Sequence, residues 1–191
     1  MALLDLMQQR RSIRKYLDKP VERDKLNLCL EAAQLAPSAC NAQPWKFIVV
    51  DDKALKDRLC ETAFGGIYSL SSFAREAPVM VAAVADQASY ASRVGSLIRN
   101  TRFYLIDLGI AGEHFVLQAQ ELGLGTCWIG WFNERAVKSV LKIPRGKRVA
   151  YLLSLGYYDE TAMRRTHSRR PIEKIVAFNS YEGENYNALS L

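Results

Sequence analysis

Residues 32–50 read AAQLAPSACNAQPWKFIVV and place a helix, an unusual loop and a strand in direct succession. Pro37 marks the end of the helix, because proline cannot continue the helical hydrogen bonding. The run Lys46–Val50 is rich in β-branched residues and predicts a strand. Between them lies a polar loop that is flanked by two prolines and followed by Trp45. A simple connection needs only a few polar residues, so we interpret this loop as part of a binding site.

The rest of the chain carries helical and extended patterns in a mixed order. Apolar residues at i, i+3 and i+4 predict helices, and short continuous apolar runs predict buried strands. The expected helices are 3–10, 22–36, 53–62, 99–122, which Gly123 ends, and one that Asn133 begins as N-cap; the expected strands are 46–50, 78–84, 126–131 and 149–156. A further short strand-like piece is expected after Pro171. This order predicts one α+β or α/β domain over residues 1–191, with helices covering a sheet.

The composition is that of an ordinary globular protein, with 191 residues of which 49% are apolar. No apolar run is long enough to cross a membrane, and Asp5 interrupts the segment where a signal peptide needs an apolar core. The cysteines form no C-x-x-C pair, which argues against a zinc site and a redox dithiol, and free thiols fit a reducing cytoplasm. We therefore expect a cytoplasmic protein without a membrane anchor; the cysteines are Cys29, Cys40, Cys60 and Cys127.

The net charge is +6, from 26 basic and 20 acidic residues. The basic residues form no single long run, which argues against nucleic acid as a partner. They concentrate in two short clusters, which would suit a compact anion such as a phosphate if the fold brought them together, or would otherwise be two solvated surface patches. The clusters are Arg10, Arg11, Arg14 and Lys15 near the front, and Arg164, Arg165, Arg169 and Arg170 near the end.

Common catalytic devices are scarce in this sequence. The histidines are His114, expected to be structural, and His167, and there is no H-E-x-x-H, G-x-S-x-G or P-loop motif. Gly123-Leu124-Gly125 lacks the third glycine of a dinucleotide fingerprint and follows a helix rather than a strand. An enzyme of this kind would leave the difficult chemistry to a cofactor.

Four blocks of sequence, in this order, resemble the nitroreductase family of FMN-dependent oxidoreductases. They are Arg10-Arg11-Ser12-Ile13-Arg14, then Ala36 to Trp45, then Gly123 to Gly130, then Ser168-Arg169-Arg170-Pro171 with Glu173. The resemblance covers nearly the whole chain, and A-P-S-x-x-N-x-Q-P-W is its most specific motif. It implies a three-layer α+β sandwich with a mixed, mainly antiparallel sheet. It also implies an intertwined homodimer with FMN at the interface. The C-terminal tail, about 171–191, carries little that would pack by itself, so we expect it to pack on the partner subunit.

The resemblance assigns roles to the two basic clusters. Arg10, Arg11 and Ser12 would contact the phosphate and ribityl chain of FMN, and Arg14 would lie at the pyrimidine edge. A cation there favours reduction, because a reduced flavin gains negative charge on that edge. Arg169, from the second basic cluster, would also contact the phosphate, and His167 would lie beside it.

The same resemblance gives a reason for the opening loop. Pro37, Ser38 and Asn41 would contact the flavin of the other subunit, and Gln43 would hold the loop or the flavin edge. Trp45 is expected in the core. Beside the ring would run Trp128, Ile129 and Gly130, where the absence of a Cβ at Gly130 lets the backbone approach and its N–H donate to flavin N5.

The implied activity is a ping-pong reaction in which NADH or NADPH passes hydride to the flavin, and a nitroaromatic, quinone or other electron-poor acceptor then takes it. No catalytic side chain and no metal are expected. One alternative is reductive dehalogenation or flavin processing on the same fold, although residues 65–77 give only a short lid. The others are a non-catalytic flavin-binding protein and, less favoured, a basic nucleic-acid binder.

Overall fold

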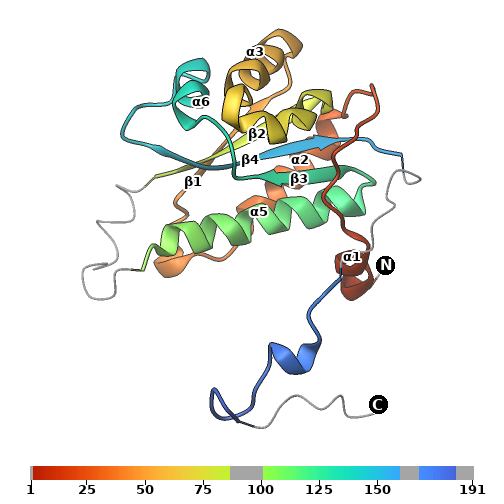
Figure 1. Cartoon of the computed structure of the whole chain (residues 1–191), viewed down its shortest axis with the longest axis vertical. Coiled ribbons are helices and arrows are strands. Elements are labelled where there is room, and N and C mark those ends of the chain that lie inside the picture. The colour runs from red at the N-terminus through yellow and green to blue at the C-terminus, as the bar shows by residue number, and fades with distance from the viewer. Residues whose placement is uncertain (1, 87–100, 160–167, 184–191) are drawn as a thin grey trace.

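A four-stranded antiparallel sheet forms the centre of the molecule in the computed structural model, which describes residues 2–86, 101–159 and 168–183 (Figure 1). The strands occur in the order β1-β2-β4-β3. Each adjacent pair is antiparallel. A parallel contact is added by the bridge between Ser12 and Thr126 at the β3 edge. The strands are β1 (Trp45–Val50), β2 (Val79–Ala85), β3 (Gly125–Ile129) and β4 (Arg148–Gly156).

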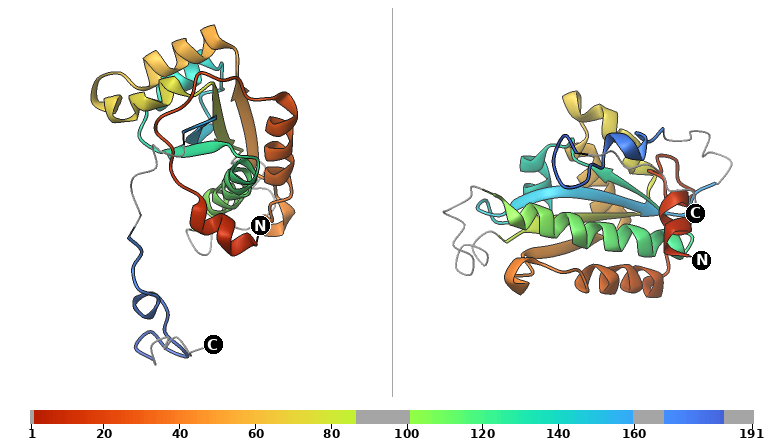
Figure 2. Two further views of the ribbon diagram at one scale, coloured as in Figure 1. Left: turned by 90° about the vertical axis from the view of Figure 1, so that its right-hand side faces the viewer. Right: turned by 90° about the horizontal axis from the view of Figure 1, so that it is seen from below.

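Helices cover both faces of this sheet and give the three layers that the resemblance implied (Figures 1 and 2). On one face lie α2 (Arg23–Gln34) and α5 (Phe103–Glu121), and α1 (Leu3–Gln9) packs near the end of α5. The other face is covered by α3 (Lys53–Ala63), α6 (Glu134–Val140) and the 3-10 segment η2 (Gly66–Glu76). No helix among the described residues combines the length and apolar character needed to cross a membrane.

The position of β2 inside the sheet explains why its sequence, VMVAAVA, has no polar residue. All seven residues are buried, because β2 lies inside the sheet and both faces are covered. Val81 and Ala83 pack in the core with Phe115 of α5, whereas Met80 and Ala82 pack in the second core beneath α3 and α6. The expectation of a buried strand here is confirmed.

The long helix α5 packs close to the sheet through a glycine. A Cβ added at Gly112 would collide with the side chains of Trp128 and Tyr151. The Tyr151 hydroxyl in turn donates to the carbonyl of Leu108, at 2.7 Å, and ties β4 to α5. The helix ends at Glu121, and Gly123 just after it has a φ of +73°, the left-handed conformation expected of a C-terminal glycine.

Several predicted boundaries hold, and one predicted strand-like piece is reduced to a single bridge residue, Ala177, after a 3-10 turn. Asn133 is the N-cap of α6, since its side chain accepts from the N–H of Ala136 at 3.2 Å. The strand expected over 126–131 ends at Ile129. The strand-like piece expected after Pro171 begins as a 3-10 turn, η4 (Ile172–Lys174). The backbone N–H groups of residues 174–176 bond to carbonyls of residues 171 and 172, so they are not available to a strand partner.

Candidate active site

The N-terminal basic segment lies against the edge strand β3. The N–H of Ile13 donates to the carbonyl of Thr126 at 2.8 Å, and Ser12 and Thr126 form the parallel bridge. The first and third sequence blocks, far apart along the chain, are therefore side by side. The basic residues 10–14 run along the strand whose end carries Trp128, Ile129 and the exposed Gly130.

One ion pair and one buried thiol lie against this segment. The Nε of Arg10 lies 3.9 Å from Oε1 of Glu113 on α5. Burial raises the pKa of Glu113, while Arg10 acts in the opposite direction. Burial likewise raises the pKa of the Cys127 thiol, and nearby Arg14 and a hydrogen bond with Ser12 lower it in part. The thiol therefore stays neutral, in agreement with the structural role expected of Cys127.

The two basic clusters meet at a hollow of about 330 Å³ beside α1. Its lining comprises Met7, Gln8, Arg11 and Arg169. The guanidinium of Arg11 is oriented by the carbonyls of Gln8 and Arg10, the latter at 3.0 Å. Two guanidinium groups at one hollow are a donor set suited to a phosphate. His167, Arg164 and Arg165 lie outside the described residues.

Aromatic side chains of η2 contact Arg14 and the loop after β3. The guanidinium carbon of Arg14 lies 5.6 Å from the ring centre of Phe73. Tyr68 and Trp131 pack with ring centres 5.2 Å apart. The Trp131 indole donates to the carbonyl of Ile67 at 2.8 Å, and Ser71 donates to the carbonyl of Trp131 at 2.9 Å. These two bonds tie η2 to the loop.

Gly130, between the end of β3 and Trp131, is exposed to solvent. A Cβ added there would meet no atom of the described chain within 4 Å, and its φ is not in the left-handed region. Nothing in the described part of the chain therefore requires glycine at this position. The open space is compatible with a planar ligand lying against the backbone, as expected for Gly130.

The loop from Pro37 to Gln43 is compact and bonded to itself. The N–H of Gln43 donates to the hydroxyl of Ser38 at 2.9 Å, and its side-chain amide donates to that of Asn41 at 3.0 Å. Three non-glycine residues, Cys40, Asn41 and Gln43, have positive φ. Such a conformation costs free energy at each residue, and it clusters at ligand sites in proteins.

A buried carboxylate, Asp107 on α5, anchors this loop. Its Oδ1 accepts from the N–H of Ala39 at 3.2 Å, and its Oδ2 has no partner among the described residues although the residue is only 3% exposed. Burial raises the pKa of Asp107, and the bond from Ala39 lowers it in part. The sequence reasoning missed Asp107, yet one acidic residue within FYLIDLGI was a signal that could have found it.

The loop and the basic segment lie at different places along α5. The loop contacts α5 at Asp107, whereas Arg10 contacts it at Glu113, about 9 Å further along the helix axis. Figure 1 shows α1 and the start of β1 toward opposite ends of α5. One chain thus brings together Arg10, Arg11, Ser12, Arg14, Arg169 and the 128–130 segment, and leaves Pro37, Ser38, Asn41 and Gln43 apart from them.

The residues to which the sequence assigned a structural role make structural contacts. Trp45 packs against the core on the α5 face. His114 Nδ1 lies 3.2 Å from the carbonyl of Ala32, which ties α5 to α2. The cysteines are all free thiols. The described residues contain no group of three or more metal-ligating side chains.

Comparison with known proteins decides the family. Residues 7–157 match the model of the Nitroreductase family, which is well over half of the chain. The chain belongs to the nitroreductase family. Like other members of this nitroreductase family, it is an oxidoreductase.

Relatives extend the match over nearly the full length. An NADH dehydrogenase of Thermus thermophilus is 31% identical over 194 residues, which cover 88% of this chain and 91% of the relative. A nitroreductase family protein from Clostridium novyi NT has a TM-score of 0.74 and 32% identity, covering 96% and 97% of the two chains. An FMN-dependent nitroreductase from Clostridium difficile R20291 has the same score and identity, covering 93% and 99%.

Proposed function

We propose that this chain is an FMN-dependent oxidoreductase that uses NADH or NADPH to reduce nitroaromatics, quinones or similar electron-poor acceptors. The observation that carries the proposal is the bridge of Ser12 to Thr126, which sets the basic segment beside the open Gly130. Family membership and the FMN-dependent relative support the cofactor. When bound, FMN would accept a hydride at N5 and return it to a second substrate in ping-pong order.

The donor set fits the anionic end of FMN. Arg10, Arg11 and Ser12 would hold the phosphate and ribityl chain, with Arg169 completing the phosphate site at the hollow it shares with Arg11. His167 is proposed beside it. Arg14 would supply positive charge at the pyrimidine edge and so favour the reduced state.

The backbone after β3 would form one wall of the ring site. Trp128 and Ile129 would pass beside the ring, and the N–H of Gly130 would donate to N5, with no side chain in the way. The Tyr68–Trp131 pair beside it offers flat aromatic surface on which a planar donor or acceptor can stack. Position and electrostatics suffice for hydride transfer, so no side chain is assigned acid or base chemistry.

A second copy of the chain would complete the site. Because one chain leaves the Pro37–Gln43 loop apart from its own basic segment, we propose that the loop serves the flavin of the partner in a homodimer. Pro37, Ser38 and Asn41 would contact that flavin, and Gln43 would keep the loop in shape through its bonds to Ser38 and Asn41.

The function is tested by spectroscopy and turnover. We expect purified protein to show flavin absorption bands, to release FMN on denaturation, and to oxidise NADH or NADPH only when a nitroaromatic or quinone is present. FMN binding without turnover would instead indicate a flavin-binding protein. Turnover restricted to an iodinated phenol would indicate a dehalogenase. A colourless protein that takes up no FMN would contradict the proposal.

The shared site is tested by mixing two defective chains. Arg14→Ala removes a residue of the basic segment, and Asn41→Ala removes one of the loop. Each homodimer should be weakly active. Unfolding and refolding an equal mixture should restore roughly a quarter of the wild-type sites, because half of the dimers are mixed and each has one intact site. A mixture no more active than its parents would place both residues in a site built by one chain.

A further inference from the structure

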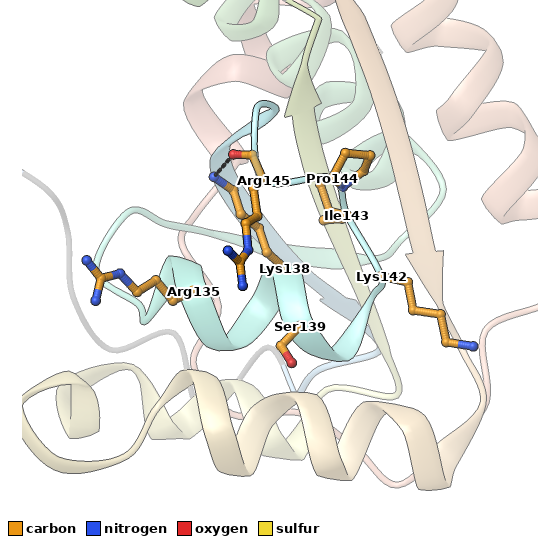
Figure 3. Close-up of a pocket in the computed structure, with 7 residues that line it drawn as sticks. All are labelled: Arg135, Lys138, Ser139, Lys142, Ile143, Pro144 and Arg145. Carbon is orange, nitrogen blue, oxygen red and sulfur yellow. Dashed lines mark hydrogen bonds between the residues drawn. The ribbon is translucent and has the colours of Figure 1, made fainter.

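A second basic hollow lies at α6, on the opposite face of the sheet from α5 (Figures 1 and 3). It has a volume of about 840 Å³ and is formed by α6 and the turn that follows it. Its lining, which we call the α6 hollow, comprises Arg135, Lys138, Ser139, Lys142, Ile143, Pro144 and Arg145. No part of the proposed flavin site belongs to it.

The charge of the α6 hollow is concentrated and largely unpaired. Residues 135–148 contain six basic side chains and no acidic one. Lys138 is neutralised by Glu134 at 2.8 Å, but Arg135, Lys142 and Arg145 form no ion pair with any residue in the described ranges. Three cations at one hollow repel one another unless an anion compensates them.

A hollow on the neighbouring helix α3 shows the contrast. It is lined by Arg58 and Arg75 together with Asp57 and Glu61, so its positive and negative charges are equal in number. The α6 hollow has the same kind of cations without the carboxylates. Its charge is thus a property of the site rather than of the surface in general.

Two adjoining pieces of backbone supply these cations. Arg135 and Lys138 lie on α6, and Lys142 and Arg145 lie in the turn that follows it. Within this turn Lys142 has a φ of +53°, which is left-handed. The N–H of Ile143 donates to the carbonyl of Lys138 at 2.9 Å. In this type of helix ending the left-handed residue, here residue 142, is usually a glycine. Here a lysine occupies that position.

The arrangement of the cations points to an extended anion. Arg135 and Lys142 reach to opposite sides of the hollow, with the guanidinium of Arg145 between them (Figure 3). Cations spread in this way are matched better by an anion that carries its charges along a chain than by a single phosphate. Among the described residues that line the hollow there is no aromatic ring on which a base could stack, which argues against nucleic acid.

We propose that the α6 hollow binds a short chain of linked phosphate groups, such as inorganic tripolyphosphate or the triphosphate of a nucleotide. Arg135, Arg145 and Lys142 contact successive phosphates, and the Ser139 hydroxyl donates to one of them. Binding rests on charge and is therefore weakened by salt. It is independent of flavin and of turnover.

The test is calorimetric titration of the FMN-saturated protein with tripolyphosphate, at low and at physiological salt. We expect one site per chain, unchanged flavin absorbance, and an affinity at least about tenfold above that of orthophosphate. If ATP binds at least as tightly as tripolyphosphate, the natural ligand is a nucleotide. If ATP binds more weakly, the natural ligand is free polyphosphate. No heat at millimolar tripolyphosphate, or tighter binding of a short DNA duplex, overturns the proposal.

Matched variants separate binding from a structural role. Lys142→Gly removes a cation and relieves a left-handed lysine, so it should weaken tripolyphosphate binding while thermal stability stays equal or rises. Arg145→Ser should weaken binding as well. Arg58→Gln, which removes one charge from the α3 hollow, should leave affinity unchanged. Equal losses of tripolyphosphate affinity in all three variants would show that binding depends only on the net charge of the protein, and would contradict a specific site.

Discussion

At the scale of single residues, Asp107 has the most unusual environment. Its folded pKa is raised, so the unfolded chain ionises this carboxyl at a lower pH than the folded chain does. The folded state therefore loses stability from this group as pH rises through the ordinary Asp pKa of about 4 to the raised value, and the loss persists above it. The anchoring bond to Ala39 partly offsets this cost at neutral pH.

Asp107→Asn should consequently stabilise the protein at pH 7, because the amide oxygen still accepts from Ala39 and no charge is buried. The midpoint of urea unfolding measures this, and its gain over wild type should shrink toward pH 4. Asp107→Ala, which also removes the acceptor, should lose about 1 kcal/mol relative to Asp107→Asn. A lower midpoint for Asp107→Asn at pH 7 would reveal a donor to Oδ2 from outside the described chain.

Helix α5 offers a matched pair of glycines at the scale of elements. Gly112→Ala should destabilise by about 1–3 kcal/mol, because its Cβ overlaps Trp128 and Tyr151 and would push α5 from the sheet. Gly109→Ala meets no atom within 4 Å and should stabilise by about 0.5–1 kcal/mol through helix propensity. Urea unfolding of both variants checks the contrast. Similar losses at the two positions would mean that the outer side of α5 is also covered.

The elements could be predicted wherever local chemistry decides the conformation. The apolar run of β2, the cap at Asn133 and the left-handed Gly123 act over a few residues, and the structure has all three. The strand-like piece expected after Pro171 is reduced to the bridge residue Ala177, because short-range bonds after Pro171 close a 3-10 turn, which a pattern of apolar residues does not reveal. Two pieces of polar chemistry were missed, because their meaning depends on what packs around them: the burial of Asp107, and the cations that α6 and the turn after it bring to one hollow.

At the scale of the whole molecule, the two predicted flavin-binding regions contact α5 at different places, Asp107 and Glu113, and the thiol of Cys40 can report on this separation. Cys40 is exposed within the loop, whereas the other three cysteines are buried. Burial raises the pKa of Cys29 to about 12 and of Cys60 to about 11, and raises that of Cys127. Only the thiolate reacts with alkylating agents, so Cys40 should be modified first.

Added FMN should slow the alkylation of Cys40 in flavin-free protein, because the proposed site brings the loop against a flavin. The rate is followed with iodoacetamide and mass analysis, and Cys40→Ser should remove the fast reaction. An unchanged rate in saturating FMN would separate the loop from the flavin site and weaken the proposal of a shared site.

The described part of the C-terminal tail, residues 168–183, extends away from the body of its own chain (Figures 1 and 2). Its apolar side chains at Ile172, Ile175, Phe178 and Tyr181 are exposed, Tyr181 at 99%. If the tail packs on a second copy as proposed, burying these side chains requires an encounter between two chains. Recovery of flavin binding after denaturation should then accelerate with protein concentration, whereas recovery of helix signal within each chain should not. Folding and assembly would thus be separable in time, and the oxidoreductase would gain its activity only at the second, bimolecular step.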